Sequence, residues 1–168
     1  MKILLFFFFL AIGHLGHAQT ESSAKKSEIP SVIKKLIDEK YKGHRSVKYY
    51  KEILRDTLYY EAVFRHNKDE YSLLFDTLGN VYETEITVPY SEIETSIRQK
   101  IEEKLNKDFP SFKIKKSQEV ILKSQLMYEF LIKGKQDKSV SFREYYFDRQ
   151  GNFLKQEEVE LEAIQTLF

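Results

Sequence analysis

The string Phe-Asp-x-x-Gly-Asn occurs twice in this chain, and it constrains the fold more than any other feature. Its fixed positions are Phe75, Asp76, Gly79 and Asn80 in the first copy and Phe147, Asp148, Gly151 and Asn152 in the second. An aspartate can accept hydrogen bonds from backbone amides two residues on, and a glycine supplies the positive φ that closes a type I turn with a bulge. The alternative is a calcium loop, which alternates several oxygen ligands over about twelve residues. Each string offers one carboxylate, so the string predicts a hairpin turn, used twice.

Similar elements surround both strings. Apolar residues at helical spacing, among them Ile33 and Ile37, predict a helix from Ile29 to about Gly43. Ile97, Ile101 and Leu105, at four-residue steps, predict a second helix over 91–109. Alternating, aromatic-rich runs at 46–55, 57–66 and 69–76 predict three strands, and a fourth strand follows the turn. The sequence therefore predicts an α+β fold of two tandem repeats, each with one helix plus a four-stranded antiparallel sheet.

The first residues are typical of a secretory signal peptide. Lys2 precedes an apolar run over 3–12, and the small residues Gly16 and Ala18 stand at the −3 and −1 positions of a cleavage site. We expect cleavage after Ala18 and a periplasmic or secreted protein. The run is too short for a membrane-spanning helix, which needs about 20 apolar residues. The predicted parts are a signal peptide (1–18), a linker (19–28), a first repeat (29–89), a second repeat (90–160) and a C-terminal tail (161–168).

The charge balance excludes several classes of partner. The chain has 27 Lys and Arg against 26 Asp and Glu, so removal of Lys2 with the signal peptide leaves a formal net charge of zero. Nucleic-acid binding needs a strong positive field, which this composition lacks. The basic run at 113–116 fits the solvated face of an amphipathic strand. The chain contains no cysteine, which excludes disulfides, thiolate metal sites and a thiol nucleophile.

Catalytic signals are weak. Outside the signal peptide the only histidines are His44 and His66, which we expect at a helix end and a strand end. Neither has the spacing of a zinc site, and the chain has no nucleophile-elbow motif or phosphate loop. The carboxylate pairs Glu83/Glu85 and Glu102/Glu103 are interpreted as solvated positions. We therefore expect no catalytic residue, no metal and no cofactor.

These features resemble the PepSY-like family of exported bacterial proteins, which has the fold of the beta-lactamase inhibitory protein. The residues that carry the resemblance are Ile29, Pro30, Tyr60, Glu61, Phe75, Asp76 and Gly79 in the first half, and Val88, Pro89, Phe109, Pro110, Tyr128, Glu129, Phe147, Asp148 and Gly151 in the second. The first half departs from the pattern, with Lys42-Gly43 in place of a Phe-Pro pair. The resemblance covers about residues 29–160. It implies one curved sheet surface with both helices on one face, and an opposite face that grips a target protein.

Adjacent tyrosines support a binding face. Successive strand residues point to opposite sides, so each pair, such as Tyr145-Tyr146, places one ring on each face. Taking Tyr60, Ala62 and Phe64 as facing the helix leaves the neighbouring positions on the helix-free face. The candidate binding residues on that face are Tyr59, Glu61, Arg65, Met127, Glu129, Lys133, Arg143 and Tyr145.

The sequence therefore favours an exported, non-catalytic binding module whose partner is a periplasmic or extracellular protein or peptide. The family resemblance implies that such a module can act as an inhibitor of its target. An alternative is a small-ligand or envelope-stress protein that uses the crevice between the repeats. Under either interpretation the rings could also simply cover the sheet and stabilise cross-strand pairs.

Overall fold

The computed structural model describes residues 20–136 and 139–159. The predicted signal peptide and C-terminal tail lie outside these residues. The described elements are β1 (Thr20–Ala24), η1 (Lys26–Glu28), α1 (Ser31–Lys40), β2 (Arg45–Leu54), β3 (Thr57–His66), β4 (Asp69–Phe75), β5 (Val81–Thr87), η2 (Tyr90–Glu92), α2 (Thr95–Asp108), β6 (Ser111–Leu122), β7 (Gln125–Gln136), β8 (Ser139–Asp148) and β9 (Phe153–Glu158). None of the described helices is long and apolar enough to cross a membrane.

The strands form one antiparallel sheet of nine strands in sequence order, from β1 to β9. The prediction of two repeats, each with one helix plus a four-stranded sheet, is therefore wrong. One reason is β1, which lies in the segment predicted to be a linker and pairs with β2 from Thr20 opposite Ile53 to Ala24 opposite Tyr49. The other reason is that the strands are ordered as a single sheet of nine and not as two sheets of four.

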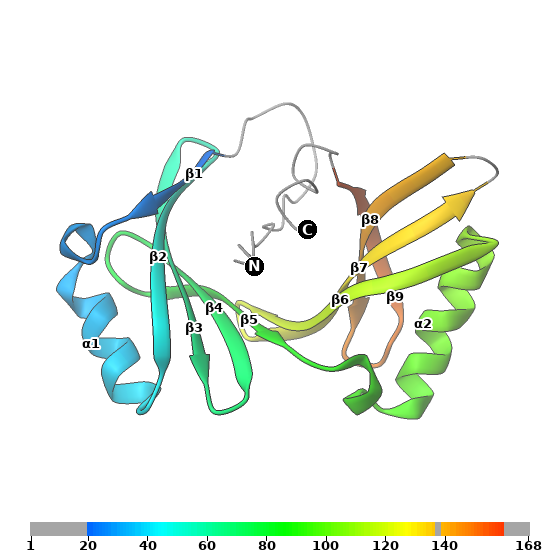
Figure 1. Cartoon of the computed structure of the whole chain (residues 1–168), viewed down its shortest axis with the longest axis horizontal. Coiled ribbons are helices and arrows are strands. Elements are labelled where there is room, and N and C mark those ends of the chain that lie inside the picture. The colour runs from blue at the N-terminus through cyan, green and yellow to red at the C-terminus, as the bar shows by residue number, and fades with distance from the viewer. Residues whose placement is uncertain (1–19, 137–138, 160–168) are drawn as a thin grey trace. The chain divides into compact units, whose positions relative to one another are not determined.

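Two compact units can be recognised within the described residues. The first contains residues 20–86 and 121–124, and the second contains 87–120, 125–136 and 139–159. Each unit has one long helix packed on one face of its strands (Figure 1). We call the face of the strands opposite the helix the open face of that unit.

The core of the first unit lies between α1 and β2–β4. Ile33 and Ile37 of α1 are fully buried, as their helical spacing predicts. They belong to one apolar cluster with Ala62 and Phe64 of β3 and with Leu73 of β4. Because Ala62 and Phe64 face the helix, the alternate residues of β3 point to the open face.

The core of the second unit is built in the same way from α2, β7 and β8. Ile101 and Leu105 of α2 are fully buried and share a cluster with Phe130 of β7 and with Tyr145 and Phe147 of β8. The alternate residues of these two strands therefore point to the open face of the second unit.

Both Asp-x-x-Gly-Asn strings form the predicted hairpin turn. In the first turn, Asp76 Oδ1 accepts hydrogen bonds from the backbone N–H groups of Leu78 and Asn80, each at 2.9 Å. The second turn repeats them on Asp148 Oδ1, which accepts from Gln150 and Asn152 at 2.8 Å. Gly79 and Gly151 have φ values of +86° and +78°, which glycine adopts without strain. The prediction of a structural turn is confirmed.

Candidate functional site

The open face of the first unit carries three of the predicted binding residues. Tyr59, Glu61 and Arg65 alternate along β3 with the residues that face α1. The ring of Tyr59 lies 5.2 Å from that of Tyr82, centroid to centroid. The Arg65 side chain is 69% exposed, and its Nε lies 3.7 Å from Glu70 Oε2. This face thus combines aromatic rings with charged groups.

Glutamates recur on this open face from one strand to the next. Glu21 of β1 is directly opposite Glu52 of β2. Glu52 is opposite Tyr59, which places Glu61 two residues further along β3 on the same face. Ser72 of β4 donates a 2.5 Å hydrogen bond to Glu61 Oε1 and is itself opposite Glu85 of β5. Glu52, Glu61 and Glu85 are all buried, although like charges opposite each other destabilise a sheet.

Burial shifts the protonation of two of these carboxyl groups. It raises the pKa of Glu61 well above its ordinary value, and the negative charges of Glu21, Glu85 and Glu52 raise it further, whereas the hydrogen bond from Ser72 lowers it. Burial also raises the pKa of Glu21 from 4.5 to about 7. Glu21 and Glu61 therefore hold protons at a pH where isolated glutamates are ionised.

The open face of the second unit is different. Leu131 of β7, Phe142 of β8 and Val159 form a small apolar cluster. Beside it, Tyr146 donates a 3.0 Å hydrogen bond to Glu144 Oε2, and both residues are buried. The ammonium group of Lys155 lies 4.5 Å from the centroid of the Tyr146 ring. This side of the sheet thus holds a buried apolar cluster next to a buried, hydrogen-bonded Tyr–Glu pair.

Three further predicted residues lie on β7 at positions that alternate with the helix-facing Tyr128, Phe130 and Ile132. These residues are Met127, Glu129 and Lys133. Glu129 is buried and directly opposite Tyr146. The Lys133 ammonium group lies 5.6 Å from the centroid of the Phe142 ring, which is its cross-strand neighbour.

The placement of Arg143 and Tyr145 on the open face is wrong. Tyr145 is fully buried in the cluster formed with α2, and Arg143 lies over the ring of Phe109 at 5.6 Å, on the helix side of the sheet. Their strand has aromatic residues on both faces, so alternation alone does not choose between Tyr145 and Tyr146. The open-face member of the pair is Tyr146.

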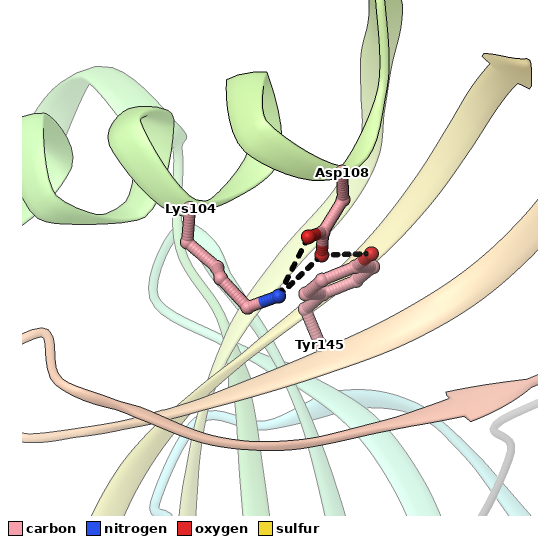
Figure 2. A network of polar contacts seen from close by, with 3 residues as sticks. All are labelled: Lys104, Asp108 and Tyr145. Carbon is pink, nitrogen blue, oxygen red and sulfur yellow. Dashed lines mark hydrogen bonds and ion pairs between the residues drawn. The ribbon is translucent and has the colours of Figure 1, made fainter.

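Tyr145 instead completes a polar network under the end of α2. Figure 2 shows Lys104 and Tyr145 both directed at the carboxylate of Asp108. The Tyr145 hydroxyl donates to Asp108 Oδ2 at 2.8 Å, and Lys104 Nζ lies 2.7 and 2.5 Å from the two carboxylate oxygens. Burial, together with the hydrogen bond to Asp108, raises the pKa of Tyr145. The network connects α2 to β8, and its role is structural.

The sequence interpretation also missed the buried acids. Glu83 and Glu85, which the sequence predicts to be solvated, are 2% and 4% exposed, so this prediction is wrong. Glu52 and Glu144 were not singled out, and both are buried as well. These glutamates alternate along their strands with residues that face a helix, and this pattern places them on the open face. It does not indicate that they are buried, because charged residues in strands normally mark a solvated face.

The two histidines are not brought into a metal site. His44 Nε2 lies 2.8 Å from Asp38 Oδ1. His66 packs among aromatic rings, 5.6 Å from Tyr41 and 6.0 Å from Tyr71 between centroids. Within the part of the chain that the structure describes, no three histidine or acidic residues are arranged to hold a metal ion.

Comparisons with known proteins show the fold. A BLIP-like protein from Bacteroides fragilis is 13% identical and has a TM-score of 0.60, with 78% of this chain and 86% of that chain covered. A DUF2874 family protein from Bacteroides ovatus is 18% identical, with a TM-score of 0.62 and coverage of 78% and 88%. A protein from Bacteroides eggerthii, provisionally named as periplasmic, is 14% identical, with a TM-score of 0.64 and coverage of 78% and 89%. The chain has the BLIP-like fold.

Comparisons of the amino-acid sequence do not assign the chain to a family. No family model matches the chain, and no curated protein matches it either. The structural likeness therefore supports the part of the predicted resemblance that concerns the β-lactamase inhibitory protein, and not the PepSY-like family specifically.

Proposed function

We propose that this protein is an exported, non-catalytic binding module that recognises another protein or a peptide through the open face of its sheet. The observation that carries the proposal is the open face of β3, where the ring of Tyr59 and the exposed side chain of Arg65 lie on either side of the buried Glu61. Rings with a polar tip, together with arginine, are enriched at protein interfaces. The BLIP-like fold of the structural neighbours supports the same interpretation.

Export and family are part of the proposal. The signal peptide predicted over 1–18 and the provisional periplasmic name of one structural neighbour both favour the periplasm. The Asp-x-x-Gly-Asn turns and the Ile-Pro and Val-Pro helix starts favour membership of the PepSY-like family. Inhibition of a target enzyme would follow from the same mode of binding.

The test compares two double variants that differ in the face they change. Tyr59→Ala/Arg65→Ala removes a ring and a charge from the open face of β3. Lys35→Ala/Glu39→Ala is the matched control, because these two side chains are 73% and 67% exposed on α1 and form only a surface ion pair. Circular dichroism and thermal unfolding would first establish that both variants are folded.

Capture from a bacterial envelope extract would identify a partner for the unmodified protein, and calorimetry with that purified partner would then measure its affinity. We expect the open-face variant to bind at least tenfold more weakly and the helix variant to bind like the unmodified protein. Equal affinity of the two variants would contradict the proposed site. Absence of any specific partner would contradict the proposed function.

A further inference from the structure

The sheet ends at two strands with very different edges. Among the described residues, β1 and β9 each pair on one side only. β1 has the sequence TESSA, five residues without a large apolar side chain. Short polar edges of this kind protect a sheet against further pairing. β9 has charged residues too, but it also contains Phe153 and Leu154, which are 40% and 52% exposed, so its edge is less polar than that of β1.

The central residues of β9 are complementary to themselves. They read Lys155-Gln156-Glu157. When two copies of β9 run antiparallel with Gln156 opposite Gln156, each Lys155 stands opposite the Glu157 of the other copy. Directly opposed residues of antiparallel strands have Cβ atoms about 4.5–5.5 Å apart, so the two opposite-charge pairs would be in contact. A shift that puts Lys155 opposite Lys155, or Glu157 opposite Glu157, sets like charges against each other.

Lys155 and Glu157 already form an ion pair with each other, and each can form one with a second copy instead. They are two residues apart on one face of β9, with Lys155 Nζ 2.7 Å from Glu157 Oε1. Their side chains are 32% and 24% exposed, respectively. The two ion pairs within the separate strands, one in each copy, can thus be replaced by two ion pairs across a two-fold axis.

We propose that β9 is an interaction surface for a second copy of this chain, which pairs antiparallel through its own β9 about a two-fold axis at Gln156. The interface is isologous, so it closes at two copies and does not propagate into fibres. Leu154, half exposed in the single chain, lies beside this contact. The inference is independent of the proposed function, because it concerns the sheet edge and not the open face.

The absence of cysteine from the chain allows a direct test by cross-linking. Gln156→Cys places one thiol on each copy at the two-fold axis, within reach of a disulfide in the proposed register. Ser22→Cys is the matched control, because it places one thiol on the β1 edge. Under mild oxidation we expect at least tenfold more covalent dimer through position 156 than through position 22. Equal or lower yield through position 156 would overturn the proposal.

A charge exchange tests the register without relying on a thiol. Lys155→Glu and Glu157→Lys each set like charges across the axis, so each variant alone should sediment as a monomer at a concentration where the unmodified protein dimerises. A mixture of the two variants restores both opposite-charge pairs, so it should dimerise again. An unmodified protein that stays monomeric at millimolar concentration, or a dimer that neither substitution weakens, would also overturn the proposal.

Discussion

Gly151 lies against Ile97 of α2 so closely that a methyl group at its Cα would be 3.0 Å from Ile97 Cγ2 and 3.2 Å from both the Cα and the carbonyl oxygen of Ile97. The hairpin turn and the helix are therefore in direct contact through a residue that has no side chain. In the first unit, Gly79 has the same relation to Val32, with a distance of 2.4 Å to Cγ1. Each turn thus fixes the position of its helix.

Gly151→Ala should destabilise the protein more than Gly43→Ala. Both glycines have a positive φ, which costs an alanine about 1 kcal/mol. At Gly43 nothing lies within 4 Å of the added methyl group, so only this conformational cost applies. At Gly151 the contacts include backbone atoms of α2, which cannot rotate away as the end of a side chain can, and we expect a loss of about 2–4 kcal/mol. Urea denaturation of the two variants measures the difference, and equal losses would show that the helix contact is unimportant.

Tyr145→Phe removes the hydrogen bond to Asp108 but keeps the ring in the core. Because the acceptor is charged and partly buried, we expect a loss of about 1–2 kcal/mol in the free energy of unfolding. The control is Tyr145→Phe in an Asp108→Asn background, where the same substitution should cost less. A Tyr145→Phe variant as stable as the unmodified protein would mean that the hydroxyl has an equivalent alternative partner.

The local features of this fold were predictable, and the non-local ones were not. The turns at Asp76 and Asp148 depend on contacts within five residues, so the sequence pattern was sufficient to predict them. The burial of Ile33 and Ile101 followed from helical spacing. By contrast, the pairing of β1 with β2 is a contact between distant residues, and the polar sequence of residues 20–24 does not distinguish an edge strand from a linker.

The residues of the candidate site were likewise predictable only where a local pattern determines which face they occupy. On β3, apolar residues of one face alternate with polar residues of the other, which placed Glu61 and Arg65 on the open face. On β8, both Tyr145 and Tyr146 are fully buried, one against α2 and the other beside Glu144, so that the pattern has no polar side. The burial of Glu52 depends on strands brought together by the fold, and no short pattern predicts it.

Addition of calcium should leave the stability unchanged if both Asp-x-x-Gly-Asn turns are purely structural. The two carboxylate oxygens of Asp76 are already used, Oδ1 by backbone amides and Oδ2 by the Asn80 side chain at 2.9 Å. A ligand at a hundred times its Kd would stabilise the folded state by about 2.7 kcal/mol, which shifts the melting temperature by several degrees. Thermal unfolding in EDTA and in millimolar calcium chloride should give the same midpoint, and a rise with calcium would revive the ligand-loop interpretation.

The carboxyl groups of the first open face should make the protein less stable as the pH rises. The pKa of Glu21 is raised from 4.5 to about 7, so this group contributes stability that is fully present below pH 4.5 and is lost as the pH rises through 7. The raised pKa of Glu61 acts in the same direction and extends the loss to higher pH. Glu21 is only partly buried, so screening by solvent reduces its share to about 1 kcal/mol.

Glu21→Gln isolates this contribution, because glutamine keeps the shape and cannot ionise. The difference in unfolding free energy between the unmodified protein and the variant, measured in urea at pH 5 and pH 8, should move in favour of the variant at the higher pH. Asp148→Asn is the matched control, because its difference from the unmodified protein should be the same at pH 5 and pH 8. Hydrogen bonds from Asn152 and Gln150 outweigh desolvation and lower the pKa of Asp148, so its contribution is lost only as the pH falls below about 4. A difference for Glu21→Gln that is the same at both pH values would mean that Glu21 titrates normally, and that the glutamate row is solvated in solution.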